Sequence, residues 1–231
     1  MKARHNVLMV LFLFLCSFKS ISAQSENETD NFDPEKYMIP ATEDIYKDPK
    51  VTPYLDWLKK HTGVEVVLRR AGVTNATMWR ERIGSHGYKG LATLVKEIKK
   101  YPEGCLKTLG VKKFFLTGYS KEIFRPGYDN SGMYIPALNK LIVAIDIDPS
   151  HVEHAVHHEM SHVVDHKLGH LKEWKEWMDL NPTGFSYKKK PICFEEECYH
   201  DFYVQDCAFV SCYATSSDSE DRAEMMAFMM T

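Results

Sequence analysis

Beyond its first 23 residues, the sequence has no hydrophobic run approaching the length of about 20 residues that a membrane-spanning helix requires. It has no basic stripe either, and its formal net charge of −3 makes it a poor candidate for binding nucleic acid. Internal repeats and low-complexity tracts are absent as well. We therefore expect one domain without a membrane anchor, and we expect it to be a monomer.

Cysteine is scarce, and most of it is clustered. One of the 6 cysteines, Cys16, lies in the first 23 residues and lacks the small residues that precede a lipidated cysteine. Cys193, Cys198, Cys207 and Cys212 form one cluster, which in an oxidising compartment predicts two disulfides in a single loop region. Cys105 is left over, and we expect it to be free. A zinc ribbon is a weaker interpretation, because the cluster contains no Cys-x-x-Cys spacing.

The first 23 residues have the pattern of a secretory signal peptide. Lys2 and Arg4 precede an apolar run over residues 7–15, and Ile21-Ser22-Ala23 predicts the cleavage site. Cleavage would remove three basic residues, so the net charge would change from −3 to −6 (−3 minus 3). The pattern predicts a secreted, extracellular protein.

Two further features belong to the N-terminal part of the mature chain. Asn27 and Asn75 each begin an Asn-x-Thr sequon, which predicts glycosylation in this compartment. Residues 24–50 are acidic and polar and contain three prolines, so we expect a poorly ordered lead-in. The predicted domain then spans residues 51–231.

Hydrophobic patterning predicts an α+β fold with a small sheet. The expected strands cover residues 64–68, 111–117 and 141–147, and the expected helices cover 54–61, 88–100, 150–170, 174–178 and 217–230. Residues 119–132 look like an irregular loop. The strand over 141–147 could be an ordinary buried strand, or an exposed edge that binds an extended peptide by β-augmentation.

The sequence His157-His158-Glu159-Met160-Ser161-His162 contains the pattern His-Glu-x-x-His. On a helix, His158 and His162 lie one turn apart on one face, where both rings can bind one Zn²⁺. Glu159, beside the first ligand, can accept a proton from a metal-activated water and act as the catalytic base. Ser150 and Glu153 form a capping box that would begin this helix.

Other interpretations of this helix remain open. His154, His158, His162 and His166 form a ladder at intervals of four residues, so another pair could bind metal. The segment could also be a solvated, histidine-rich helix without a ligand. Only the pair His158 and His162 carries a glutamate in the position of a base.

A catalytic zinc needs a third protein ligand. The metzincin pattern fails here, because Asp165 and Leu168 occupy its glycine and final histidine positions. Glu220, on the predicted final helix, is a natural supplier, although Ser217-x-x-Glu220 is itself a capping box. Glu176 is the main competitor for the third ligand.

The motifs of the second half of the chain resemble those of the lethal-factor-like zinc metallopeptidases, which are of the gluzincin type. The matching segments are His158-Glu-x-x-His162, Trp174, Leu180-Asn-Pro-x-Gly-Phe185, Phe209-Val-Ser-x-Tyr213-Ala214 and Glu220-Asp-x-Ala-Glu224. The resemblance covers roughly residues 110–231 and is closest to the zinc-binding metallopeptidase group within that family. It departs from the family in the cysteine cluster and in the 11 residues after Glu220, where a longer final helix is expected, as in a chain truncated at its C-terminus.

The resemblance implies a zincin-like fold and a role for several residues. Glu220 would be the third zinc ligand, Glu159 the general base, and Tyr213 a donor to the tetrahedral intermediate, unless it is a core aromatic. Glu224 would support a ligand through a hydrogen bond. Asp165 could orient His158 or lie exposed near the end of its helix.

The function so predicted is a secreted zinc metallopeptidase, which hydrolyses bonds in a peptide or protein substrate with Zn²⁺ as its cofactor. The alternative is a secreted metal-binding protein without catalysis, which would use the seven histidines between residues 151 and 170 as ligands.

Overall fold

The structure is a computed structural model of the chain, and it describes residues 45–68, 83, 86–118, 131–169, 174–187 and 209–231. Several predictions fall outside these residues. They concern the signal peptide, the sequons at Asn27 and Asn75, most of the loop over 119–132, and Cys193, Cys198 and Cys207.

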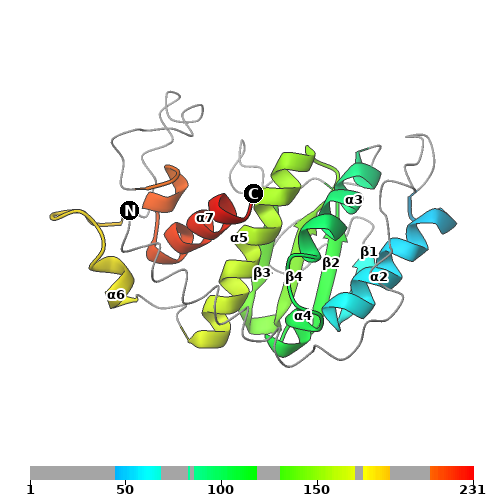
Figure 1. Cartoon of the computed structure of the whole chain (residues 1–231), viewed down its shortest axis with the longest axis horizontal. Coiled ribbons are helices and arrows are strands. Elements are labelled where there is room, and N and C mark those ends of the chain that lie inside the picture. Colours follow the sequence, from blue (N-terminus) through cyan, green and yellow to red (C-terminus); the bar gives the residue numbers. More distant parts are fainter. Residues whose placement is uncertain (1–44, 69–82, 84–85, 119–130, 170–173, 188–208) are drawn as a thin grey trace.

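A four-stranded mixed sheet forms the centre of the fold, as the predicted α+β class requires (Figure 1). Its strands are β1 (Glu65–Leu68), β2 (Lys113–Thr117), β3 (Gly132–Ile135) and β4 (Lys140–Ala144). The order is β1-β2-β4-β3, with β1, β2 and β4 parallel and β3 antiparallel to β4.

The position of β4 corrects one interpretation of the sequence. β4 lies between β2 and β3, and the side chains of Leu141 to Ala144 are buried, so this strand cannot receive a peptide along an open edge. The edge strand beside it is β3, which sequence patterning missed. β3 has only four residues, too few to establish an alternation.

Helices α2 (Thr52–Thr62), α3 (Gly87–Ile98) and α4 (Cys105–Thr108) accompany the sheet. The predicted apolar stripe of α3 is confirmed, since Leu91, Leu94, Val95 and Ile98 are fully buried. A Cβ on Gly90 would lie 1.9 Å from the carbonyl oxygen of Ile145. Glycine at this position therefore lets α3 approach the chain where it leaves β4 and turns toward the next helix.

That next helix, α5 (Pro149–Leu168), carries the His-Glu-x-x-His segment. It begins one residue earlier than predicted, and its cap is Asp148 in place of Ser150. The Asp148 carboxylate accepts hydrogen bonds from the backbone N–H and the hydroxyl of Ser150, at 2.9 and 2.6 Å. Gly169 ends the helix in the left-handed conformation, with φ of 78°.

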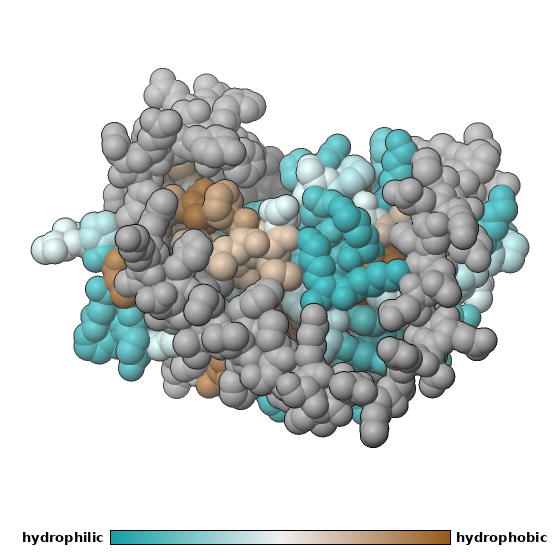
Figure 2. All heavy atoms as spheres, viewed as in Figure 1, coloured by the Kyte–Doolittle hydropathy of each residue, from teal (hydrophilic) through white to brown (hydrophobic). Residues whose placement is uncertain are grey.

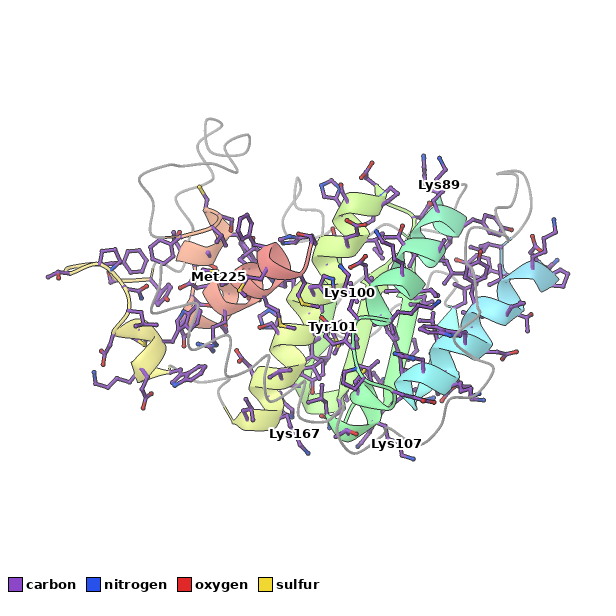
Figure 3. The ribbon with its side chains drawn as sticks, in the orientation of Figure 1. Lys89, Lys100, Tyr101, Lys107, Lys167 and Met225 are labelled. Atoms are coloured by element: carbon purple, nitrogen blue, oxygen red, sulfur yellow. The ribbon has the colours of Figure 1, made fainter. Side chains whose placement is uncertain are left out.

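A buried polar contact fixes α5 against α3. His157 places its Nδ1 atom 2.6 Å from the hydroxyl of Tyr101 and its Nε2 atom 2.8 Å from Glu97. Glu97 in turn forms an ion pair with Lys100. Figure 3 places Lys100 and Tyr101 between α3 and α5. Because His157 directly precedes His158, this contact also sets the rotation of α5 about its axis.

Helix α7 (Asp218–Met230) packs against α5, on the side of α5 away from α3 (Figure 1). A short 3₁₀ helix, η8 (Tyr213–Thr215), precedes it. As predicted, Ser217 caps α7 and accepts a hydrogen bond from the Glu220 N–H at 3.2 Å. Figure 2 shows a hydrophobic area over η8 and α7, where the side chains of Phe228 and Met229 are exposed.

The segment 174–187 is attached to the first turns of α7. It contains one helical turn, α6 (Lys175–Met178), within the residues 174–178 where a helix was predicted. Asp221 of α7 accepts hydrogen bonds from the indole N–H of Trp177 at 2.8 Å and the hydroxyl of Tyr187 at 2.7 Å. Trp177 is fully buried against α7.

The end of the predicted lead-in is ordered in the described part of the chain, which corrects its boundary. Ile45 is buried, and Asp48 accepts a hydrogen bond from the hydroxyl of Tyr88 at 2.9 Å. The 3₁₀ helix η4 (Pro49–Val51) then leads into α2. Residues 45–50 thus belong to the domain.

The cysteines differ from the prediction at one position. Cys105 is buried with a free thiol, as expected, and burial raises its pKa to about 12. Cys212 was expected in a disulfide, but its thiol is also free in this structure. Within the described residues, no helix combines the length and apolar character that spanning a membrane would take.

Candidate metal centre

Three side chains from two helices converge on one point. His158 and His162 of α5 bring their Nε2 atoms to 3.2 Å from each other. Oε2 of Glu220, on α7, lies 3.0 Å from Nε2 of His158 and 3.3 Å from Nε2 of His162. These three atoms form one of the two groups that could hold a metal ion among the described residues.

The spacing of these atoms fits a tetrahedral metal site. Ligand atoms bound to one ion at about 2.0–2.1 Å in tetrahedral geometry lie about 3.3–3.4 Å apart. The distances of 3.0, 3.2 and 3.3 Å are close to this value. Oε2 of Glu220 is also buried without a hydrogen-bond partner in the described part of the chain, and its neighbours are the two ring nitrogens. Such an atom is costly to bury unless a cation completes its environment.

Glu224 fixes the protonation of the His158 ring. Oε1 of Glu224 lies 2.8 Å from Nδ1 of His158, which assigns the proton of the neutral ring to Nδ1. The lone pair of Nε2 then faces His162 and Glu220. A carboxylate behind a ligand histidine orients the ring and raises its basicity, which is the role expected of Glu224.

The charges of the site favour a bound cation. Burial lowers the pKa of His158, but the adjacent carboxylates of Glu220 and Glu224 outweigh it and raise that pKa to about 10. Burial also lowers the pKa of His162, and the carboxylates of Glu220 and Glu159 outweigh it and raise that pKa. Burial likewise raises the pKa of Glu220, yet the two rings hold it at about 2. The cluster therefore stabilises positive charge, whether protons or a metal ion carry it.

Glu159, the predicted base, is buried beside the start of β3. A Cβ on Gly132 would lie 2.6 Å from Cγ of Glu159, so the glutamate occupies the space that glycine leaves. Burial raises the pKa of the Glu159 carboxyl, opposed by the nearby rings of His162 and His158 and by a hydrogen bond from the backbone of Tyr134. A raised pKa suits a group that must both accept and return a proton.

Tyr213 lies at the same site. Its ring stacks on the ring of His158, with centroids 5.9 Å apart and planes inclined by 29°. Tyr213 is 47% exposed, so it is not the core aromatic that the sequence also allowed. Partial burial and the carboxylate of Glu220 raise the pKa of its phenol, which therefore keeps its proton at neutral pH.

Asp165 has a different partner from the one expected. It is buried, and its Oδ2 atom lies 2.8 Å from both Nε and Nη2 of Arg222. It does not orient His158, whose Nδ1 is occupied by Glu224 and whose Nε2 faces the cluster, and it is not exposed. Asp165 instead joins α5 to α7.

None of the remaining candidate ligands belongs to the group formed by His158, His162 and Glu220. Glu176, the competitor of Glu220, is exposed on α6 and belongs to neither metal-holding group of the described residues. His166, the last residue of the histidine ladder, packs edge-on against the ring of Tyr134 with centroids 5.6 Å apart. His154 contacts Glu224 at 3.0 Å and belongs to the second group.

Sequence reasoning missed Arg222 and Gly132. Arg222 is buried, and besides Asp165 it contacts Asp218 at 2.8 Å, one turn earlier on α7. An i, i+4 pair of opposite charges was visible in the sequence, but it is more common on exposed helix faces. Gly132 left no signal, because its role depends on a side chain that approaches from another element.

Comparisons with protein-family models, curated proteins and solved structures found no match for this chain.

Proposed function

We propose that this protein is a secreted zinc metallopeptidase of the lethal-factor-like type, which hydrolyses peptide bonds. The observation that carries the proposal is the convergence of His158, His162 and Glu220 with a buried glutamate, Glu159, adjacent to the first ligand. Three ligands leave a fourth position for water, which distinguishes a catalytic zinc site from a closed structural one. Secretion rests on the signal-peptide pattern of residues 1–23.

The three ligand side chains would hold the ion, and Glu224 would keep His158 in the tautomer that presents Nε2. When bound, zinc supplies a Lewis acid that lowers the pKa of water towards about 7 and polarises a carbonyl group. Glu159 accepts the proton of the attacking water and passes it to the amine that leaves. Its buried position beside Gly132 keeps the carboxylate close to the ligand histidines.

Two further features support peptide hydrolysis. Tyr213 keeps its phenolic proton and lies over His158, where it can donate a hydrogen bond to the oxyanion of a tetrahedral intermediate. Within the described residues, β3 is an edge strand, and it lies beside Glu159. An extended peptide can pair with such an edge through its backbone.

The second candidate function is metal binding without catalysis. It is favoured by the second metal-holding group, which contains His154, His158 and Glu224. A binding protein has no need of a buried glutamate beside its ligands, whereas Glu159 is buried at a cost in desolvation. We therefore place this function second.

Glu159→Gln separates the two functions. The variant removes the base and keeps the shape of the side chain, so we expect peptide cleavage to fall by at least about 100-fold while one tight zinc per chain remains. Glu153→Gln, a half-buried glutamate near the start of the same helix that pairs with Lys96, is the matched control and should retain both. A zinc-loaded wild-type protein that cleaves no peptide in a diverse library, or a Glu159→Gln variant as active as wild type, would reject the peptidase.

A further inference from the structure

The carboxylate of Glu224 contacts two histidines of α5, only one of which belongs to the proposed zinc site. Oε1 of Glu224 lies 2.8 Å from Nδ1 of His158 and 3.0 Å from Nε2 of His154. The rings of His154 and His158 lie with centroids 6.0 Å apart, on adjacent turns of the helix. The ring nitrogens and the carboxylate oxygen are close enough to hold a metal ion.

His154 is accessible, whereas Glu224 is buried behind it. The side chain of His154 is 37% exposed, and that of Glu224 is 9% exposed. Burial raises the pKa of Glu224, but the adjacent rings of His154 and His158 outweigh it and hold the pKa below its ordinary value. An ion arriving from solvent would therefore meet an imidazole nitrogen first and an ionised carboxylate next.

We propose that His154 and Glu224 form a second, weaker zinc site that inhibits the enzyme when zinc is in excess. The binding site stands on its own geometry, while the inhibition rests on the proposed peptidase function. His158 keeps its Nδ1 proton and its place in the first site, so the second ion has two protein ligands in place of three. Fewer ligands and the repulsion between two nearby cations make this site the weaker one.

The inhibition follows from the effect of the second ion on the hydrogen bond between Glu224 and His158. A cation on Glu224 draws electron density from the carboxylate and weakens its hydrogen bond with Nδ1 of His158. That hydrogen bond orients the ring and raises its basicity, and removing such a partner commonly costs 10–100-fold in metal affinity or activity. The second ion thus weakens the first site without touching it.

Titration of the full mature chain with Zn²⁺ alone tests the binding. After removal of metal, equilibrium dialysis and calorimetry should show one tight and one weaker equivalent in the wild type. His154→Ala should weaken the second equivalent by at least about 10-fold and leave the first unchanged, with His154→Gln as a second variant. His151→Ala, an exposed histidine at the start of α5, is the matched control and should keep both equivalents.

The outcomes separate this proposal from the peptidase. The second site would be overturned if His154→Ala still bound two equivalents of zinc. It would also be overturned if the wild type bound a single equivalent that His162→Ala loses and His154→Ala keeps. Both outcomes would leave the catalytic centre intact. A single equivalent lost in His154→Ala but kept in His162→Ala would instead move the only metal to the second group, against both proposals.

Activity provides the second measurement. The ratio of activity with two equivalents of zinc to activity with one should fall well below one in the wild type and stay near one in His154→Ala. An unchanged ratio in a wild-type protein that holds both ions would remove the inhibitory role.

Discussion

Oδ2 of Asp165 lies 2.8 Å from two nitrogens of Arg222, and both residues are buried between α5 and α7. Arg222 extends the contact to Asp218 in the first turn of its own helix and lies over the ring of Trp174. Arg222 lies two residues from Glu220, so this interaction fixes the position of the Glu220 carboxylate relative to the histidines of α5. The candidate ligands come from two helices, and this buried ion pair holds the helices in register.

Arg222→Met should therefore destabilise the protein by about 3–5 kcal/mol, because it leaves buried carboxylates without a partner. Unfolding in urea, followed by circular dichroism, measures the change. The control is Lys175→Met, which breaks the exposed pair with Asp179 and should cost less than about 1 kcal/mol. Similar losses of unfolding free energy in the two variants would show that the buried ion pair contributes no more to stability than the exposed one.

Glu220→Gln should abolish tight zinc binding and peptide cleavage, because an amide supplies neither the charge nor the basicity of the ligand carboxylate. The cap of α7 should survive, since it is formed by the hydroxyl of Ser217 and the Glu220 backbone N–H. Zinc content and the thermal stability of the metal-free proteins check both points. Glu176→Gln, which changes an exposed glutamate on α6, is the control. A Glu220→Gln variant that holds zinc at wild-type strength would rule out Glu220 as a zinc ligand.

Gly132→Ala should lower kcat on the order of 10²-fold, because the new Cβ would displace Cγ of Glu159, which lies 2.6 Å away. KM and zinc content should change far less, since the three atoms nearest to the new Cβ all belong to Glu159 and none to His158 or His162. Steady-state kinetics and metal analysis give both values. Ser131→Ala, the neighbouring change, should behave as wild type, and a fully active Gly132→Ala protein would show that Glu159 has room to move.

Cys105 should give the stability a dependence on alkaline pH. Its thiol has a pKa of about 12 in the folded protein, and an unfolded thiol ionises near about 8.5. Its contribution to the free energy of unfolding is thus complete below pH ~8.5 and is lost as the pH rises toward ~12. In Cys105→Ala this loss, up to about 1.4 kcal/mol per pH unit, should disappear. Urea titrations at several pH values between about 8 and 11 measure the slopes, and parallel slopes in the two proteins would contradict the prediction.

Local sequence was sufficient for several elements. The apolar spacing of Leu91, Leu94, Val95 and Ile98 predicts α3 because a helix repeats every 3.6 residues, whatever packs against it. The same periodicity places His158 and His162 on one face of α5. The cap of α5 was assigned wrongly to Ser150, because Asp148 is also a good capping residue and only the backbone conformation decides between the two.

Local sequence could not assign partners to the buried charged residues. The sequence allowed Asp165 either to orient His158 or to lie exposed near the end of its helix, yet its partner is Arg222 on another helix. Cys212 belongs to a dense cysteine cluster, but spacing along the chain does not establish that two sulfurs meet. β3 was missed because a four-residue strand is defined by its pairing with β4.

The sequence by itself determined the helical spacing of two imidazoles and a glutamate, and hence the chemistry that one helix could offer. Tertiary structure alone decided which carboxylate completes the candidate site, because both Glu220 and Glu176 remain candidates until α7 packs against α5. It also decided that Glu224 supports His158 and reaches His154, and that Gly132 makes room for Glu159. The physical reason is that a metal site is defined by distances of a few ångströms between side chains, and only the packing of separate elements sets those distances.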